Sequence, residues 1–245
     1  MKRTLIVAAA LILSIGTALA SGKIHWTYSG NEGPENWGKL SPEFSMCAEG
    51  RNQSPIDLSG FVEADLEPIK FDYKADATEI LNNGHAIQVN YAPGSSITLG
   101  GHSFELKQFH FHSPSENTIE GRSFPMEAHL VHADKDGNLA VVAVMFVEGA
   151  SNSAVKALWK KMPKEEGVKN ALKDGLSVTG VMPEGRDYYR FNGSLTTPPC
   201  TEGVAWLVLK DAVSVSKEQI EAFEHVMHHP TNRPVQPVNA RAVLK

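Results

Sequence analysis

Short apolar stretches separated by turn residues recur through most of this 245-residue chain. Their β-branched and aromatic content predicts strands over Ala86–Tyr91, Ser96–Leu99, Phe104–Phe111, Ala128–Val131, Leu139–Val147 and Val204–Leu209. Turn signals lie between them at Asn82-Asn83-Gly84, Pro93-Gly94, Gly100-Gly101 and Asp136-Gly137-Asn138. The stretch Leu139–Val147 is apolar throughout, which indicates a strand in the middle of a sheet with both faces covered.

Helical patterns are few. Ser216-Lys217-Glu218-Gln219 has the form of a capping box, and Ile220, Phe223 and Met227 follow at core spacing. A shorter helix is predicted over Ala154–Lys161. The part up to about Asp57 is rich in Gly, Pro and Trp and is predicted to be irregular. The pattern as a whole predicts one β-dominated domain with peripheral helices.

The first twenty residues have the form of a signal peptide. Lys2 and Arg3 precede an apolar run from Leu5 to Ile15, and Ala18-Leu19-Ala20 matches a cleavage site. We therefore expect cleavage after Ala20, a mature domain over residues 21–245, and export of the protein. The apolar run is too short to span a membrane comfortably, so no membrane insertion is expected.

The charge of the mature domain excludes some partners. The signal segment holds two of the 23 basic residues and none of the 28 acidic ones, so the formal charge without it is −7. A mildly acidic chain without a basic stripe is a poor candidate for binding nucleic acid or anionic lipid.

The chain has two cysteines, Cys47 and Cys200. In an exported protein an isolated pair most simply forms one disulfide bond, and two buried free thiols are the alternative.

Three histidines form the strongest chemical pattern in the sequence. His110 and His112 alternate along one predicted strand, so their side chains project from the same face. The turn-containing connection that follows lets the next strand return and place His129 opposite them. Three imidazoles without a fourth protein ligand are typical of catalytic zinc, where the open position takes water.

A His-x-His pair on a strand is also an ordinary polar face, and the neighbouring residues decide between the two interpretations. Gln108 shares the face of His110 and His112, and Glu127 shares the face of His129. Ligating histidines donate their second ring N–H to acceptors of this kind. The combination favours a zinc site.

The chain resembles the α-class carbonic anhydrases of the bacterial, exported type over essentially its whole mature length. The matching segments are His25-Trp26-x-Tyr28, Gly33-Pro34-Glu35-x-Trp37, Gln53-Ser54-Pro55-Ile56-Asp57, Asn83-Gly84-His85, Gln108-Phe109-His110-Phe111-His112, Ser115-Glu116, Glu127-x-His129-Leu130-Val131-His132, Ser194-Leu195-Thr196-Thr197-Pro198-Pro199 and Asn232-Arg233-Pro234. Their number and order make the match specific. The resemblance implies a β-dominated α+β fold, a single domain with a large, twisted, mixed and mostly antiparallel central sheet and a few short peripheral helices.

The resemblance also implies a reaction and the residues that perform it. The reaction is the reversible hydration of carbon dioxide to bicarbonate by attack of zinc-bound hydroxide, with a side esterase activity. Zinc is assigned to His110, His112 and His129, while Glu116 and Thr196 act as a pair beside it. His85 matches the proton shuttle. The substrate pocket corresponds to Val131, Val141, Leu195, Thr196, Thr197 and Trp206, with Val204 close by.

One position departs from the family pattern, and several other histidines are interpreted as structural and not catalytic. Asn117 stands where the family commonly has histidine, which puts local stability more than chemistry in doubt. His102 is predicted in a hairpin, and His132 away from the face of His129. The cluster of His225, His228 and His229 ends a helix, with a second metal site as the minor alternative.

The family further implies inhibition by sulfonamides and small anions, a periplasmic or secreted location, cis peptides before Pro55 and Pro199, and a homodimer as one of the assemblies open to it. Two other functions compete with the enzyme. One is a non-catalytic binding module on the same fold, and the other is a periplasmic zinc carrier. The presence of all three ligands together with Glu116 and Thr196 favours the enzyme.

Overall fold

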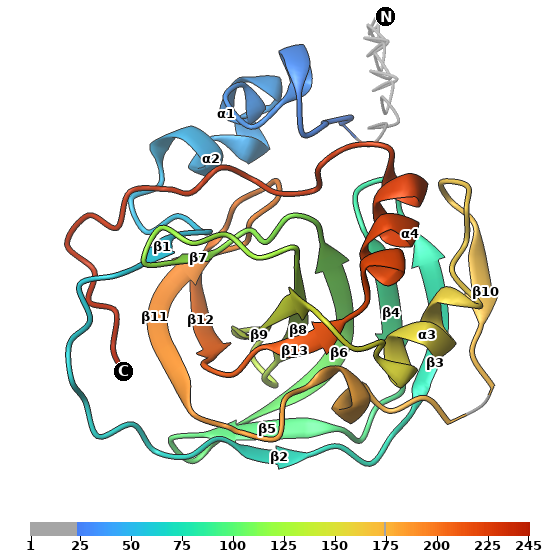
Figure 1. Ribbon diagram of the computed structural model, residues 1–245. Coiled ribbons are helices and arrows are strands. Elements are labelled where there is room, and N and C mark those ends of the chain that lie inside the picture. The colour runs from blue at the N-terminus through green and yellow to red at the C-terminus, as the bar shows by residue number, and fades with distance from the viewer. Residues whose placement is uncertain (1–23, 174) are drawn as a thin grey trace, which may run out of the picture.

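One large mixed sheet dominates the computed structural model, which describes residues 24–173 and 175–245 (Figure 1). Within these residues the sheet has 11 strands, and its main path runs β10-β3-β4-β6-β8-β9-β12-β11. The strands of this path are β3 (Ala77–Asn82), β4 (Ile87–Tyr91), β6 (His102–His112), β8 (Met126–Ala133), β9 (Leu139–Glu148), β10 (Lys169–Ala171), β11 (Tyr188–Ser194) and β12 (Glu202–Leu209).

The remaining strands extend this path or stand apart from it. β5 (Ser96–Leu99) pairs with β6 and with β2 (Lys70–Asp72), and β13 (Val213–Val215) pairs with β9. A separate two-stranded sheet joins β1 (Asp57–Leu58) to β7 (Thr118–Ile119). Within the large sheet only β12 and β13 run parallel to their neighbour β9, and the other pairs are antiparallel. The predicted fold class is confirmed.

Strand β9 lies in the interior of the sheet, as its apolar sequence predicted. Ala140, Val142, Val144 and Phe146 belong to a core cluster on one face, and the alternate residues of β9 belong to a cluster on the other. Because successive side chains of a strand point to opposite faces, one strand contributes to both cores. A strand covered on both faces needs apolar residues at every position.

The first core cluster is covered by two helices, α3 (Ser153–Trp159) and α4 (Lys217–Met227). In α4 the Ser216 side chain accepts a hydrogen bond from the Gln219 N–H, and Gln219 Oε1 accepts one from the Ser216 N–H, so the predicted capping box is confirmed. Ile220 and Phe223 are buried on the inner side of this helix. The short 3-10 helix η3 (Val178–Val181) adds two buried valines to the same core.

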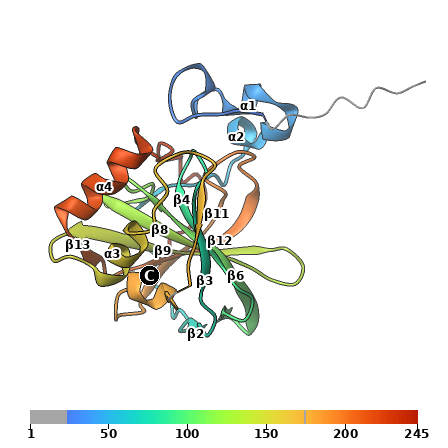
Figure 2. The ribbon, with the colours of Figure 1, turned by 90° about the vertical axis from the view of Figure 1, so that its right-hand side faces the viewer.

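Between residues 24 and 50 the chain contains only short helical turns. These are η1 (Gly30–Glu32), α1 (Trp37–Leu40), η2 (Pro42–Phe44) and α2 (Met46–Glu49). Figure 2 shows α1 and α2 together at one end of the molecule, beyond the sheet. Buried Trp37 anchors them, with its indole N–H donating to the carbonyl oxygens of Thr27 and Glu32.

Several strands escape detection by hydrophobic pattern. β3 and β11 are half-buried and interrupted by polar residues such as Glu79 and Asn192, and β11 also by Gly193. Their pairing partners, β4 and β12, hold them in place through backbone hydrogen bonds that the side-chain pattern does not encode. The signal peptide predicted over residues 1–20 lies outside the described residues. No helix among the described residues has the length and apolar character needed to cross a membrane.

The disulfide bond between Cys47 and Cys200 is present and joins positions 153 residues apart. Both sulfurs are buried beside Trp37 in a small third core cluster. The bond attaches α2 to the loop that follows Pro198 and Pro199. The expected cis peptides before Pro55 and Pro199 are also present, together with one before Pro114.

We predict that the Cys47→Ala/Cys200→Ala double variant loses about 2–5 kcal/mol of unfolding free energy, because the unfolded chain gains the freedom of a long open loop. Urea denaturation of the two proteins measures the difference. Dithiothreitol should destabilise the wild type and leave the double variant unchanged. Equal stability of the two oxidised proteins would contradict the prediction.

His132 is a buried histidine on β8 that takes no part in the triad. Its Nε2 lies 2.9 Å from the Tyr73 hydroxyl and its Nδ1 lies 3.2 Å from the carbonyl oxygen of Ala140. Burial lowers the pKa of His132 to about 4, and the backbone carbonyls of Ala140 and Leu130 act in the opposite direction. The folded protein therefore keeps this imidazole neutral in mildly acidic solution, whereas the unfolded chain protonates it.

This difference predicts a loss of stability in acid. Below the unfolded pKa of about 6.5 and down to about 4, the unfolded state binds a proton that the folded state does not, which costs up to about 3 kcal/mol. We expect the His132→Gln variant to lack this component of the pH dependence in urea denaturation. The exposed His102→Gln variant serves as the control and should keep the wild-type slope. Parallel pH profiles for His132→Gln and the wild type would refute the assignment.

Candidate metal centre

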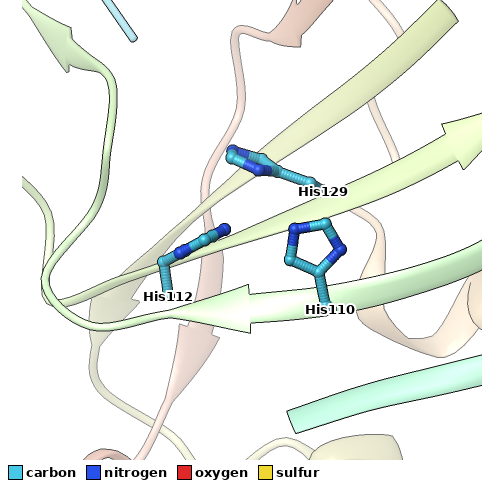
Figure 3. Close-up of side chains that lie close together, drawn as sticks. All are labelled: His110, His112 and His129. Atoms are coloured by element: carbon cyan, nitrogen blue, oxygen red, sulfur yellow. The ribbon is translucent and has the colours of Figure 1, made fainter. Parts of the chain in front are cut away.

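The pairing of β6 with β8 brings the three predicted histidines together. The register sets His110 directly opposite His129, and alternation along β6 puts His112 on the same face. Figure 3 shows the three rings converging from the two strands. One nitrogen of each ring lies within 4.8 Å of the others. His112 and His129 are buried, while His110 is partly exposed.

Each ring has one nitrogen close to an oxygen acceptor, and in His110 and His112 the contact is a hydrogen bond. His110 Nδ1 lies 2.9 Å from Gln108 Oε1, and His112 Nδ1 lies 2.5 Å from the carbonyl oxygen of Thr231. His129 Nε2 lies 2.9 Å from Glu127 Oε1. The other nitrogen of each ring, His110 Nε2, His112 Nε2 and His129 Nδ1, is left free of these acceptors. His112 Nε2 is buried and has no hydrogen-bond partner among the described residues.

Burial favours the neutral form of the triad. It lowers the pKa values of His110 and His129 well below the usual histidine range, and repulsion from neighbouring imidazoles lowers them further. A neutral imidazole whose one nitrogen donates a hydrogen bond presents a lone pair at the other. Three such lone pairs and a buried nitrogen without a partner fit a zinc ion, which accepts three imidazoles and leaves a fourth position open.

Glu127 is a buried carboxylate with partners on both oxygens. Oε2 accepts from the backbone N–H groups of Glu116 at 2.7 Å and Asn117 at 2.8 Å. Oε1 accepts from the Asn117 side-chain amide at 2.7 Å and also faces His129. Burial raises the pKa of Glu127 to about 7, and the hydrogen bonds from Asn117 act to lower it.

These contacts show what Asn117 does in place of the family's usual histidine. Besides its bond to Glu127, its Oδ1 accepts the N–H of Ile56 at 3.1 Å, so both ends of the amide are used. The side chain is fully buried. Asparagine therefore satisfies this buried acceptor without carrying charge.

Glu116 lies between Glu127 and the triad. Its Oε1 accepts the backbone N–H of Arg233 at 2.8 Å, and its Oε2 lies 3.5 Å from His112 Nε2 and 3.8 Å from His129 Nδ1. Burial raises its pKa to about 8, while the Arg233 N–H and the Thr196 hydroxyl act to lower it. The structure thus places the predicted Glu116 and Thr196 together, beside the triad.

The residues expected to form the substrate pocket also lie together. Val141, Val204 and Trp206 belong to the second core cluster, and Val131 and Leu195 pack against it. The Trp206 ring meets the His129 ring edge to face, with 4.8 Å between centroids. Thr197 is half-buried in the loop after β11, where its carbonyl oxygen accepts the Cys200 N–H at 2.8 Å. Apolar surface therefore adjoins the triad.

His85 lies apart from the triad in the turn between β3 and β4. Among the described residues its ring contacts are with aromatic side chains of the N-terminal segment. It stacks on Trp26, with centroids 3.6 Å apart and planes at 10°, and Tyr28 is edge-on to it at 6.4 Å. The ring is half-buried.

The sequence gives little indication of two further contributors. The Thr231 carbonyl oxygen orients His112, and any residue type can supply a carbonyl there. Arg233 is buried, and its guanidinium donates to Gln53 Oε1, the Ser54 carbonyl and the Cys47 carbonyl at 2.9, 2.8 and 3.0 Å. Its segment, Asn232-Arg233-Pro234, carried part of the family resemblance, which was the only signal for it.

The histidines at the end of α4 have structural positions. His228 is the left-handed C-cap of the helix, and its N–H donates to the Glu224 carbonyl. In the part of the chain that the structure describes, the triad is the one group of three or more His, Cys, Asp or Glu side chains close enough together to hold a metal ion.

The comparisons with known proteins agree with this geometry. The family model for eukaryotic-type carbonic anhydrase matches residues 32–245, and the chain belongs to this family. A carbonic anhydrase of Pectobacterium carotovorum is 46% identical over 96% of this chain and 97% of its own length. One from Neisseria gonorrhoeae is 45% identical over 99% and 98%. The solved structure of the α-carbonic anhydrase of Thermovibrio ammonificans with sulfanilamide has a TM-score of 0.90 and 50% identity, covering 91% of this chain and 100% of the other.

The Asn117 contacts predict a large effect of removing the amide. Asn117→Leu keeps the approximate volume but leaves Glu127 Oε1 and the Ile56 N–H without this partner, which should cost roughly 2–4 kcal/mol of unfolding free energy. Asn117→His restores the family's residue and is the matched control, expected to lose much less. Urea denaturation of the metal-free proteins measures both, and an unchanged stability of Asn117→Leu would show that the amide is dispensable.

Proposed function

We propose that this protein is a zinc enzyme that interconverts carbon dioxide and bicarbonate, with zinc held by His110, His112 and His129. The observation that carries the proposal is the convergence of three neutral imidazole nitrogens, with the second nitrogen of each ring beside a separate acceptor. When bound, zinc acts as a Lewis acid that makes the reacting water acidic near neutral pH, an effect for which carbonic anhydrase is itself the standard example.

Glu116 and Thr196 orient the reacting oxygen. An ionised carboxylate can only accept hydrogen bonds, so Glu116 takes the hydroxyl proton of Thr196. The Thr196 oxygen is then left as an acceptor, which directs a lone pair of the reacting oxygen toward the substrate. A cation among the imidazoles would favour the ionised form of Glu116, whose Oε2 faces two of them.

Carbon dioxide is apolar, and the surface formed by Val131, Val141, Leu195 and Trp206 suits it. This surface adjoins His129, so a molecule bound against it lies near the reacting oxygen. The Thr197 backbone borders the same region. A side esterase activity at this site belongs to the proposal as well.

Each hydration releases a proton, and we assign its transfer to His85. Histidine titrates near neutral pH, so it can accept a proton from the site and release it to buffer. Encounter with hydroxide alone is too slow for fast turnover, because at about 10⁻⁷ M hydroxide even a diffusion-limited rate constant of about 10¹⁰ M⁻¹s⁻¹ gives only ~10³ events per second.

We propose export to the periplasm or medium, with cleavage after Ala20. The apolar run from Leu5 to Ile15 and the Cys47–Cys200 disulfide support this compartment, since such bonds persist where thiols are oxidised. Inhibition by sulfonamides and small anions is also proposed. Its support is the sulfanilamide complex of the Thermovibrio ammonificans relative.

The decisive experiment substitutes the ligands one at a time. We expect His110→Ala, His112→Ala and His129→Ala each to lose stoichiometric zinc and to reduce carbon dioxide hydration on the order of 10³-fold or more, because two imidazoles are too few for a stable site. Zinc analysis and stopped-flow hydration on the purified proteins measure the two effects separately.

His102→Ala is the matched control, because His102 lies exposed on the same strand, β6. It should keep both zinc and activity. Near-normal turnover in a triad variant would disprove the assignment of the ligands. Zinc binding without hydration in the wild type would instead favour a zinc carrier or a binding module.

A further inference from the structure

A group of titratable side chains surrounds His85, apart from the triad. A cavity of about 610 Å³ is lined by His25, Glu32, His85, Glu166 and His229, together with Trp26 and Tyr28. These residues come from the N-terminal segment, the turn before β4, the loop before β10 and the segment after α4. None of them contacts the triad, and the family resemblance assigns a function only to His85.

The turn that carries His85 is tightly fixed. Asn83 Oδ1 accepts the backbone N–H groups of His85 and Ala86 at 2.9 and 2.7 Å, and Asn82 Oδ1 accepts the Gly84 N–H at 2.9 Å. The backbone of His85 therefore has little freedom. Because the position of its Cα is fixed, a charge held beside the turn stays close to the His85 ring.

The loop before β10 is joined to this turn. The Gly167 N–H donates to the Asn82 carbonyl at 2.8 Å, and the Asn82 N–H donates to the Val168 carbonyl at 3.1 Å. Figure 1 shows β10 beside β3 at the edge of the sheet, with its preceding loop reaching this end. Glu166 directly precedes these two bonded residues, Gly167 and Val168, and is thereby held next to the His85 turn.

Glycine at position 84 makes room for the Glu166 carboxylate. A Cβ placed on Gly84 would lie 2.6 Å from both Cδ and Oε1 of Glu166, so the carboxylate fills the space above this residue. Gly84 also has a φ of +84°, a conformation that favours glycine. The carboxylate therefore sits over the residue immediately before His85.

The other groups that face His85 give Glu166 its importance. Trp26 stacks on the ring, and Tyr28 is a half-buried, neutral phenol whose hydroxyl is buried. His25 is engaged by Glu32 at 3.0 Å. Burial lowers the pKa of His85, Glu166 raises it, and charge on His25 or His229 lowers it further. Among the described residues, Glu166 is thus the carboxylate that acts to raise the pKa of this ring.

We propose that Glu166 is a positioning residue of the proton shuttle, whose carboxylate stabilises the protonated ring of His85 in its stacked position beside the cavity. The proposal rests on the shuttle function assigned to His85 above. The proton moves from the site to His85, remains there next to Glu166, and leaves to a buffer base that reaches the cavity. Burial and the imidazoles of His25 and His229 disfavour the protonated ring of His85, and Glu166 opposes both effects.

The test combines a titration with kinetics. Proton NMR of the zinc-loaded protein follows the His85 ring, assigned by its absence in His85→Gln, in the wild type and in Glu166→Gln. We expect the pKa of His85 to fall in Glu166→Gln, and 0.5 M NaCl to lower it in the wild type but less in the variant, because salt screens partly exposed pairs. In weak buffer kcat should fall roughly two- to tenfold with kcat/KM nearly unchanged, since proton transfer follows the acceptor's pKa.

Two controls separate this effect from a structural one. Glu165→Gln removes an adjacent exposed carboxylate that does not line the cavity, and it should change neither quantity. Glu166→Asp keeps the charge, so the pKa of His85 in this variant should lie between the values for Glu166→Gln and the wild type. An unchanged His85 pKa in Glu166→Gln, or an equal fall in Glu165→Gln, would overturn the proposal.

The kinetics of His85→Ala separate this proposal from the shuttle itself. If its kcat in weak buffer falls and recovers with added imidazole, His85 is the shuttle and the Glu166 variants report on it. If kcat does not fall, the shuttle function fails and Glu166 with it as a positioning residue, even where the NMR shift is found. The NMR titration needs no turnover, so failure of the Glu166–His85 interaction is visible by itself.

Discussion

One buried carboxylate, Glu127, connects the parts of this site. It accepts three hydrogen bonds from the adjoining turn, two from backbone N–H groups and one from Asn117, and it also faces His129. The ligand strand β8 and the turn that carries Glu116 are therefore fixed to the same two oxygens. Burying a carboxylate is costly unless it is hydrogen-bonded, so the turn and the strand have to form together. The positions of Glu116 and, through it, Thr196 depend on this arrangement.

The sheet supplies the second constraint, because it determines which side chains can meet. His110 faces His129 only in the observed register of β6 and β8, and a shift by one residue would turn β8's ligand toward the opposite core. The neighbouring positions leave little freedom to slip. Phe109 and Leu130, paired next to the histidines, are buried in the first core cluster, and a shift of one residue would move apolar side chains like these out of that core.

The sequence predicts much of this site because strand alternation is a simple rule. It places His110 and His112 on one face with Gln108, and His129 on a face with Glu127, and in the structure Gln108 lies against His110 and Glu127 against His129. The family resemblance adds Glu116, Thr196 and the apolar cluster, which no periodicity could indicate because they come from separate loops and strands. The central strands and the capped helix were predicted for the same reason, since their patterns are long and regular.

Other features depend on contacts that a local pattern does not contain. The strands β3 and β11 exist through their pairing partners, and the orienting acceptor of His112 is a backbone carbonyl that has no sequence signature. Glu166 likewise comes from a loop far along the chain. It lies near His85 because Gly167 and Val168 form hydrogen bonds with Asn82. Sequence patterns describe what an element buries, whereas these contacts depend on which elements become neighbours.

Arg233 links segments that are made at very different times. Its side chain binds Gln53, Ser54 and Cys47, and its backbone N–H binds Glu116, so contacts with sequence separations of 117 to 186 residues converge on one position. During synthesis the triad strands and Glu116 emerge long before this arginine does. Until it arrives, Glu116 Oε1 and the acceptors on Gln53, Ser54 and Cys47 lack this donor, and the site cannot reach its final geometry. Completion of the catalytic site is thus coupled to the closing stage of folding, and partly folded chains should be inactive even with their central sheet in place.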